Sequence, residues 1–164
     1  MTLAVIVLAL VTAQRLGELV LSRRNTARLI ARGAVEVAPG HYPAIVLLHT
    51  AWLAGLWWLA WDRAVGLPWL AVFVALQAAR LWVLASLGAR WTTRIVVVPG
   101  ETLVRTGPYR FMAHPNYAVV AGEIAVLPLA FGLPWYAVAF TILNGAVLAL
   151  RIRAENRALA DTGR

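Results

Sequence analysis

The sequence contains neither cysteine nor lysine, and only seven of its 164 residues are acidic. The absence of cysteine excludes disulfides, thiolate metal ligands and cysteine nucleophiles. All 15 strongly basic residues are consequently arginines, and the formal net charge is +8. Such a charge suits a nucleic-acid-binding protein when it gathers on one face, whereas these arginines flank apolar runs. We therefore expect no nucleic-acid partner.

Apolar residues make up 62% of the chain, and the mean hydropathy is +0.74. Soluble domains are usually about 45–50% apolar, and a helix needs about 20 apolar residues to cross a bilayer. The apolar runs predict five transmembrane helices, at about 2–21, 42–61, 67–88, 117–131 and 135–150. We therefore predict an all-α, polytopic membrane protein, with one integral membrane domain over residues 1–164 surrounded by the lipid bilayer.

Three segments outside these spans have a character of their own. Residues 25–41 are polar and contain glycines, which indicates an interfacial connection. Residues 92–98 and 102–104 are β-prone and flank the turn pair Pro99–Gly100, which predicts a small hairpin or a short folded loop. Residues 151–164 are rich in arginine and predict a charged C-terminal helix that leaves the membrane.

The distribution of arginine predicts how the chain crosses the membrane. Twelve of the 15 arginines lie in the segments 22–41, 89–113 and 151–164, which five spans place on one side, and Arg63 alone lies in the opposite loops. Because positive loops stay in the cytoplasm, we expect the N-terminus outside and the C-terminus inside. The arginine-only, alanine-rich composition is typical of a GC-rich genome, which indicates a bacterial inner membrane.

Four charged residues fall inside the predicted spans: Arg15, Glu18, Arg80 and Glu123. Arg15 and Glu18 are spaced i, i+3 and can neutralise each other on one helix face. Charged groups within a membrane face protein or water rather than lipid. Glu123 is thus either a structural partner of Arg80 or of the Arg15–Glu18 pair, or a functional acid, and the sequence leaves both open.

The densest polar stretch, residues 106–117, is followed across two apolar runs by an arginine-rich segment. The first holds Gly107-Pro108-Tyr109 and His114-Pro115-Asn116-Tyr117, and the second, residues 151–159, reads RIRAENRAL. Their order and spacing resemble the isoprenylcysteine carboxyl methyltransferase family, whose pattern is G-x-Y, R-H-P-x-Y and R-[IV]-x-x-E-E-x-x-L. The resemblance covers roughly residues 88–160. Ala113 stands in place of the pattern's Arg, and Asn156 in place of its second acid.

This resemblance implies an enzyme that uses S-adenosylmethionine, releases S-adenosylhomocysteine and methylates a lipophilic acceptor at the cytoplasmic face without a metal. It is most similar to the small bacterial branch, some members of which O-methylate long-chain phenols or pyrones. The cofactor region is then about 89–160. The implied catalytic residues are His114, Arg151 and Glu123. The implied cofactor contacts are Tyr109, Arg110, His114, Asn116, Tyr117, Arg151, Glu155 and Asn156.

The chemistry of the cofactor agrees with these residue types. Arg151 suits its carboxylate because the planar guanidinium makes two parallel bonds. Glu155 suits its ammonium or ribose, and Tyr109 or Tyr117 can stack on adenine or the sulfonium. A carboxylate acceptor is already ionised at neutral pH. A phenol instead calls for a base, for which His114 and Glu123 are the candidates.

Two alternatives stay open. The same fold could methylate a phospholipid amine or another small amphiphile. A different class is a non-catalytic membrane protein, such as a small transporter or assembly subunit, in which Arg15, Glu18, Arg80 and Glu123 line a polar path. Cofactor binding separates the two classes, because only the enzyme requires it.

Overall fold

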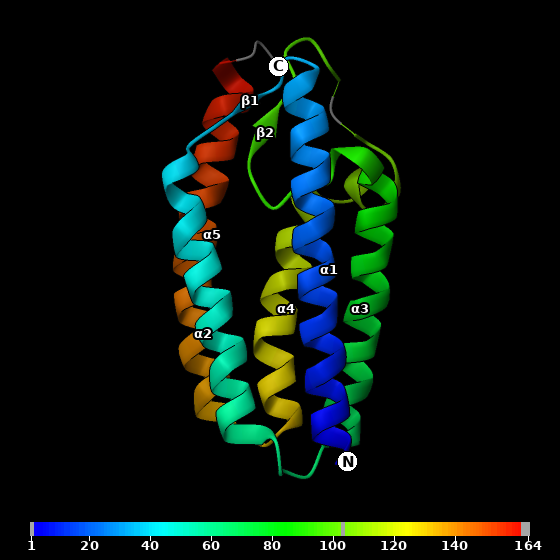
Figure 1. The fold of residues 1–164 in the computed structure, drawn as a ribbon, viewed down its shortest axis with the longest axis vertical. Coiled ribbons are helices and arrows are strands. Elements are labelled where there is room, and N and C mark those ends of the chain that lie inside the picture. Colours follow the sequence, from blue (N-terminus) through cyan, green and yellow to red (C-terminus); the bar gives the residue numbers. More distant parts are fainter. Residues whose placement is uncertain (1, 103, 162–164) are drawn as a thin grey trace.

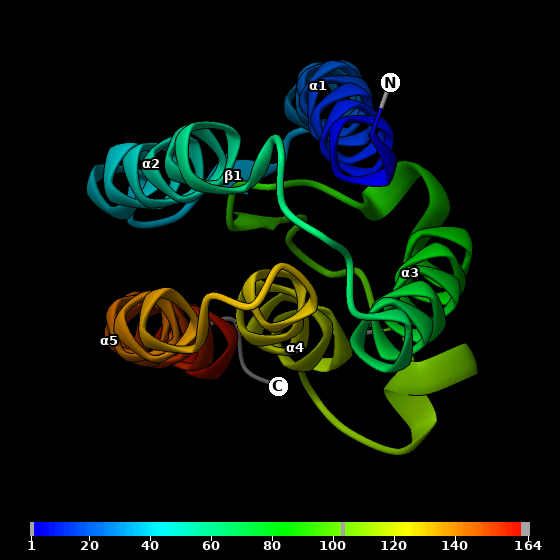
Figure 2. The ribbon, with the colours of Figure 1, turned by 90° about the horizontal axis from the view of Figure 1, so that it is seen from below.

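Five long helices run along one axis of the molecule in a computed structural model, which describes residues 2–102 and 104–161 (Figure 1). They are α1 (Leu3–Ala31), α2 (Tyr42–Ala60), α3 (Leu67–Leu87), α4 (Pro115–Ala130) and α5 (Pro134–Asp161). Seen along the axis, they form a ring in the order α1, α2, α5, α4, α3 (Figure 2). The all-α prediction is confirmed.

Four of the helices are long and apolar enough to cross a membrane, judged by length and composition. They are α1, α2, α3 and α5. The fifth, α4, has 16 residues and is about 24 Å long at 1.5 Å per residue, shorter than a hydrocarbon core of about 30 Å. It packs between α3 and α5 and buries half of its residues, so its neighbours hold it within the bundle.

Local sequence explains where the helices begin and end. Proline lies in the first turn of α2, α3, α4 and α5, where its missing N–H costs no hydrogen bond. At the end of α1, Gly33 adopts φ +86°, and the N–H groups of Gly33 and Ala34 donate to the carbonyls of Ile30 and Leu29. This Schellman arrangement stops the helix at the glycine.

The first helix continues beyond the predicted span. Residues 22–31 are the last turns of α1, although residues 25–31 were expected in the interfacial connection. Their polar side chains are used for packing: the Asn25 amide donates to the Trp91 carbonyl at 2.8 Å, and the Ser22 hydroxyl lies 2.7 Å from that of Thr93. Arginine ends the apolar run but not the helix, because arginine is itself a good helix former.

The two ends of the bundle differ. One end, called here the loop end, carries residues 32–41, residues 88–114 and the last turns of α5; the N-terminus and the loops 61–66 and 131–133 lie at the other, the hairpin end (Figure 1). The three arginine-rich segments share the loop end, as the predicted topology requires. Three short 3-10 helices also lie there, η1 (Pro39–His41), η2 (Gly88–Arg90) and η3 (Gly107–Arg110).

The short sheet at the loop end differs from the predicted hairpin. Strand β2 (Val96–Val97) pairs antiparallel with β1 (Val35–Glu36), in the register Val35 to Val97. Its partner in the described residues is therefore the α1–α2 connection and neither Thr102 nor Val104; Leu103, between them, lies outside the described residues. The segment 88–114 between α3 and α4 is called here the long loop. We call the β1–β2 pairing the clip, because it ties the long loop to the N-terminal half.

The apolar core lies toward the hairpin end. Leu8, Leu56, Phe73 and Leu127 pack there from α1, α2, α3 and α4. At the same end, the Gly66 N–H donates to the Ala130 carbonyl at 2.7 Å and joins the two loops. The interior between this core and the loop end is polar, and the candidate site lies there.

Candidate functional site

The charged residues of the predicted spans form one buried cluster. Arg80 donates to Glu18 at 2.5 and 2.6 Å and to Glu123 Oε2 at 2.7 Å. Arg15 donates to the same Glu123 oxygen at 2.7 Å and to Glu18 at 3.0 Å. The other Glu123 oxygen accepts from Gln77 at 2.8 Å. Two positive and two negative charges thus neutralise one another and join α1, α3 and α4.

The motif residues meet at the loop end, where α4 begins. His114 is the N-cap of α4 and Pro115 its first residue, but the His114 side chain makes no capping hydrogen bond. It lies instead between two residues of α5, with Nε2 3.3 Å from Asn156 Oδ1 and Nδ1 3.6 Å from Glu155 Oε2. Its ring stacks on Tyr117, with 5.3 Å between the centroids.

Tyr117 links the two motifs. Its hydroxyl donates to Glu155 Oε2 at 2.5 Å and accepts from Arg151 Nε at 2.9 Å. Arg151 and Glu155 are four residues apart and therefore lie on one face of α5. Arg151 Nη2 also donates to the Thr93 carbonyl at 2.6 Å. The arrangement connects α4, α5 and the long loop through a single phenol.

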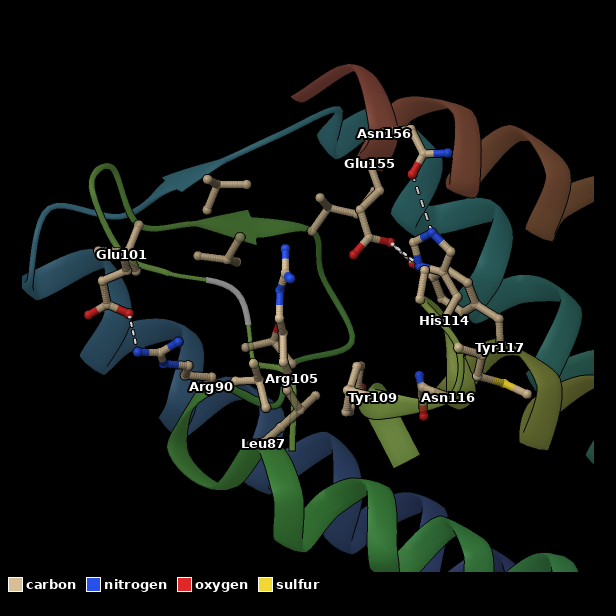
Figure 3. A pocket seen from close by; sticks show the side chains of 18 of the residues that line it. Leu87, Arg90, Glu101, Arg105, Tyr109, His114, Asn116, Tyr117, Glu155 and Asn156 are labelled. Atoms are coloured by element: carbon tan, nitrogen blue, oxygen red, sulfur yellow. Dashed lines mark hydrogen bonds and ion pairs between the residues drawn. The ribbon is translucent and has the colours of Figure 1, made fainter. Parts of the chain in front are cut away.

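A large cavity opens at the loop end around these residues, and we call it the outer cavity (Figure 3). Its volume is about 790 Å³, within the range usual for small-molecule sites. All eight residues predicted to contact the cofactor line it: Tyr109, Arg110, His114, Asn116, Tyr117, Arg151, Glu155 and Asn156. Apolar side chains such as Leu87 and Ile95 complete its walls.

Tyr109 enters the outer cavity from η3. The turn requires Gly107, which adopts φ +58° and approaches α3 so closely that a Cβ would lie 2.1 Å from Ser86 Oγ. Burial, with a smaller contribution from the Glu155 carboxylate, raises the pKa of Tyr109 to about 12. The phenol is therefore neutral at physiological pH and can act as a hydrogen-bond donor or stacking surface, but not as a base.

The long loop over the outer cavity is held by charge as well as by the clip. Arg94 Nη1 lies 2.8 Å from Glu36 Oε1, and its guanidinium lies over the Tyr42 ring. Glu101 accepts from Arg32, the C-cap residue of α1, and pairs with Arg90 at 2.9 Å. Contacts with the α1–α2 region thus position one wall of the cavity.

A second cavity, called here the inner cavity, lies within the bundle and has a volume of about 420 Å³. Mainly apolar residues of α1, α2 and α5 line it, among them Leu53, Trp57 and Leu148. It shares four lining residues with the outer cavity: Thr92, Asn116, Tyr117 and Arg151. We call these four residues the partition, because they belong to the walls of both spaces.

The sequence did not indicate the inner cavity. Of the two roles that it left open for Glu123, the contacts agree with that of a structural partner of Arg80 and Arg15. Glu123 is 1% exposed and lines neither cavity, because its carboxylate lies in the charged cluster. His49 lines the inner cavity, and its Nδ1 is 2.9 Å from the Ile45 carbonyl. No sequence motif marks the residues of α1 and α2 that line the inner cavity. In the described part of the chain, no group of His and acidic residues could hold a metal ion.

The family match in the comparison with known proteins covers the part of the chain that carries both motifs. Residues 69–161 match the isoprenylcysteine carboxyl methyltransferase family. An uncharacterized protein of Bacillus subtilis, YpbQ, is 38% identical over 169 residues, which cover 95% of this chain and 96% of that protein. An uncharacterized protein of Haemophilus influenzae is 26% identical over 167 residues, 94% of each chain. No solved structure matches significantly.

Proposed function

Because the chain belongs to the isoprenylcysteine carboxyl methyltransferase family, we propose that it transfers a methyl group from S-adenosylmethionine to an oxygen of a lipophilic acceptor. The outer cavity holds the cofactor, and the inner cavity holds the acceptor. One observation carries the proposal: the two cavities have Asn116, Tyr117 and Arg151 in common. At this wall an apolar molecule within the bundle and a polar one at the loop end come within reach of each other.

The residues of the outer cavity fit the cofactor. Glu155 offers a carboxylate for the ammonium or the ribose, and Tyr109 offers a ring face. His114, Asn116 and Asn156 supply hydrogen-bonding groups around them, and Asn116 Oδ1 is buried without a hydrogen-bond partner among the described residues. When bound, S-adenosylmethionine supplies an electrophilic methyl group on its sulfonium, so no metal is needed.

The inner cavity fits an apolar molecule with a polar end. Seven buried side-chain nitrogen or oxygen atoms of the described residues have no hydrogen-bond partner, and five of them belong to residues that line this cavity. They are Arg15 Nε, Trp52 Nε1, Trp91 Nε1, Asn116 Oδ1 and Asn144 Oδ1. Because an unpaired buried polar group costs about 1–3 kcal/mol, these atoms favour a ligand that hydrogen-bonds to some of them.

The chain's own contribution to the reaction is positioning and proton handling. Methyl transfer requires the acceptor oxygen, methyl carbon and sulfur in line, and binding in two adjoining cavities supplies that geometry. A carboxylate acceptor needs no base. For a phenol or pyrone hydroxyl, the proposed base is His114, whose ring stacks on Tyr117 of the partition and whose Nδ1 lies 3.6 Å from Glu155. Glu123 is proposed to be structural, because both its oxygens are already engaged.

The arrangement also supports a cytoplasmic outer cavity. The loop end carries the three arginine-rich segments, and positive segments stay on the cytoplasmic side. We therefore place the N-terminus outside, the C-terminus inside, and the protein in a bacterial inner membrane. The cofactor, which is made in the cytoplasm, then reaches its cavity from water.

The test uses the detergent-purified protein and two measurements. Isothermal titration with S-adenosylhomocysteine is expected to show saturable, micromolar binding. Transfer of radiolabelled methyl groups from S-adenosylmethionine to lipid-soluble compounds then identifies the acceptor by screening long-chain phenols, pyrones and carboxylic acids. A methylated amine would assign the protein to N-methylation instead. Absence of cofactor binding by folded protein would contradict the enzyme and favour the transporter or assembly alternative.

A matched pair of variants tests the partition. Tyr117→Phe removes the hydroxyl that joins Arg151 and Glu155, so we expect methyl transfer to fall at least tenfold, since each such charge-assisted bond contributes about 1.5–3 kcal/mol. The control is Tyr136→Phe, which removes a hydroxyl that donates to the Trp52 carbonyl at 2.9 Å. Tyr136 lines neither cavity. Equal activity in the two variants would mean that the partition is not the reaction site.

A further inference from the structure

Five arginines line the outer cavity, and four of them are engaged by other groups of the chain. Two of the four form ion pairs, one donates to a phenol and a backbone carbonyl, and one lies 4.4 Å over an aromatic ring. They are Arg90 (with Glu101), Arg94 (with Glu36), Arg151 (with Tyr117 and Thr93) and Arg110 (over Phe111). Arg90 and Arg94 are therefore neutralised by carboxylates, and Arg151 and Arg110 are held by neutral groups of the chain.

Arg105 is the fifth, and it has no hydrogen-bond, ion-pair or ring partner among the described residues. Its side chain projects into the cavity, with Glu101 toward one side of it and Glu155 toward the other (Figure 3). Glu101 is already bound by Arg32 and Arg90. A guanidinium that faces a cavity and is not neutralised by the chain is available to an anionic group of a ligand.

We propose that Arg105 binds the carboxylate at the amino-acid end of S-adenosylmethionine; the inference rests on the proposed function. That end carries a carboxylate and an ammonium, and the cavity offers a free cation on the loop and the Glu155 anion on α5. The ammonium therefore lies toward Glu155. The reverse orientation would place the carboxylate against Glu155 and is disfavoured by like charge.

The assignment also changes the part played by Arg151. The sequence suggested Arg151 for the carboxylate, but two of its nitrogens donate to the Tyr117 hydroxyl and the Thr93 carbonyl. Ala113, which lines the same cavity, carries no charge. Arg151 is instead a positioning residue that fixes the Tyr117 phenol at the partition, and Arg105 is the contact that selects the charged amino-acid end.

The experiment compares two ligands that differ only in the carboxylate. S-adenosylmethionine and decarboxylated S-adenosylmethionine are titrated, without acceptor, into the wild-type protein and into Arg105→Gln and Arg105→Lys. Arg153→Gln is the matched control, because Arg153 is an exposed arginine of α5 at the same end that lines neither cavity. Tryptophan emission verifies that each variant is folded.

We expect Arg105→Gln to weaken S-adenosylmethionine binding about 10- to 100-fold, the loss typical of a charge-assisted pair. Binding of the decarboxylated ligand should change less than twofold, and Arg105→Lys should recover part of the loss. The assignment is wrong, while the proposed function stands, if the Arg105→Gln protein keeps the wild-type ratio of affinities for the two ligands. That ratio is kept if the substitution weakens the binding of both ligands equally or changes neither. If the wild type binds neither ligand, the proposed function fails and the assignment with it.

Discussion

Replacing Glu123 by glutamine tests whether the charged cluster at the centre of the bundle is structural. Glu123 is 1% exposed, and one of its oxygens lies 2.7 Å from both Arg15 and Arg80. Glutamine keeps the shape but removes the negative charge, so the cluster acquires a net positive charge in the interior. Removing one partner of a buried ion pair costs about 3–5 kcal/mol. We expect Glu123→Gln to lose stability of that order.

The double variant Glu123→Gln/Arg80→Gln restores neutrality to the cluster. Arg15 and Glu18 remain 3.0 Å apart and still neutralise each other. The double variant should therefore lose at least about 1 kcal/mol less unfolding free energy than the two single variants lose together. A difference of this size is the coupling expected for residues in direct contact. Unfolding of the detergent-solubilised protein, followed by tryptophan fluorescence against temperature, measures all four proteins.

Two results would refute this reasoning. Strictly additive losses would show that Glu123 and Arg80 do not depend on each other. A Glu123→Gln variant that unfolds like the wild type, binds S-adenosylhomocysteine normally and transfers no methyl groups would show that Glu123 acts in the chemistry. Because Glu123 lines neither cavity, we expect the folded fraction of the variant to bind S-adenosylhomocysteine with unchanged affinity.

Three further predictions follow from the loop end and from the topology. Gly107→Ala combines a left-handed φ of +58° with a Cβ 2.1 Å from Ser86 Oγ, so it should lower stability by about 1–3 kcal/mol in thermal unfolding. The pKa of Tyr109 is raised to about 12, so the neutral phenol stabilises the folded state below about pH 10, and this contribution is lost as the pH rises through about 12. The free energy of unfolding should therefore fall less with pH over that interval in Tyr109→Phe than in the wild type. Since the chain has no cysteine, single-cysteine variants at Arg63 and Arg153 report the topology directly: an impermeant maleimide added to intact cells should label the first and spare the second, and the opposite pattern would reverse the proposed orientation.

The motifs allowed the outer cavity to be predicted from sequence. His114, Tyr117, Arg151 and Glu155 were expected to meet, and in the structure they are joined by hydrogen bonds or close polar contacts around one phenol. Their convergence follows from helix geometry, because residues four apart on α5 share the face that packs on the start of α4. Arg105 was missed, since it belongs to none of the motifs.

The pairing of the loop could not be predicted in the same way. A hairpin, one of the two predicted forms, would pair residues 96–97 with a segment nearby in sequence, but they pair with residues 35–36. Strand propensity identifies which residues can extend, whereas the partner of a two-residue strand depends on tertiary packing. Here that packing comes from α1, whose Asn25 and Ser22 bind the loop beside the strand.

The inner cavity had no sequence signature because it is a space between helices. Trp52 and Trp57 of α2 illustrate this: Trp52 is 1% exposed, and the Trp57 indole donates to Thr12 at 3.0 Å. Hydropathy places such residues in a membrane helix but does not distinguish lipid-facing positions from those that line a cavity. The same holds for His49.

The packing of the bundle is uneven, and the unevenness bears on how such proteins can diversify. Helix α4 makes extensive contacts with α3 on one side and with α5 on the other, whereas α1 and α2 contact their neighbours less. The tightly packed block, residues 67–161, nearly coincides with the segment 69–161 that the family shares. Helices α1 and α2 contribute most of the inner cavity's lining. Substitutions in these two helices can therefore reshape the inner cavity while the packing of residues 67–161 is kept.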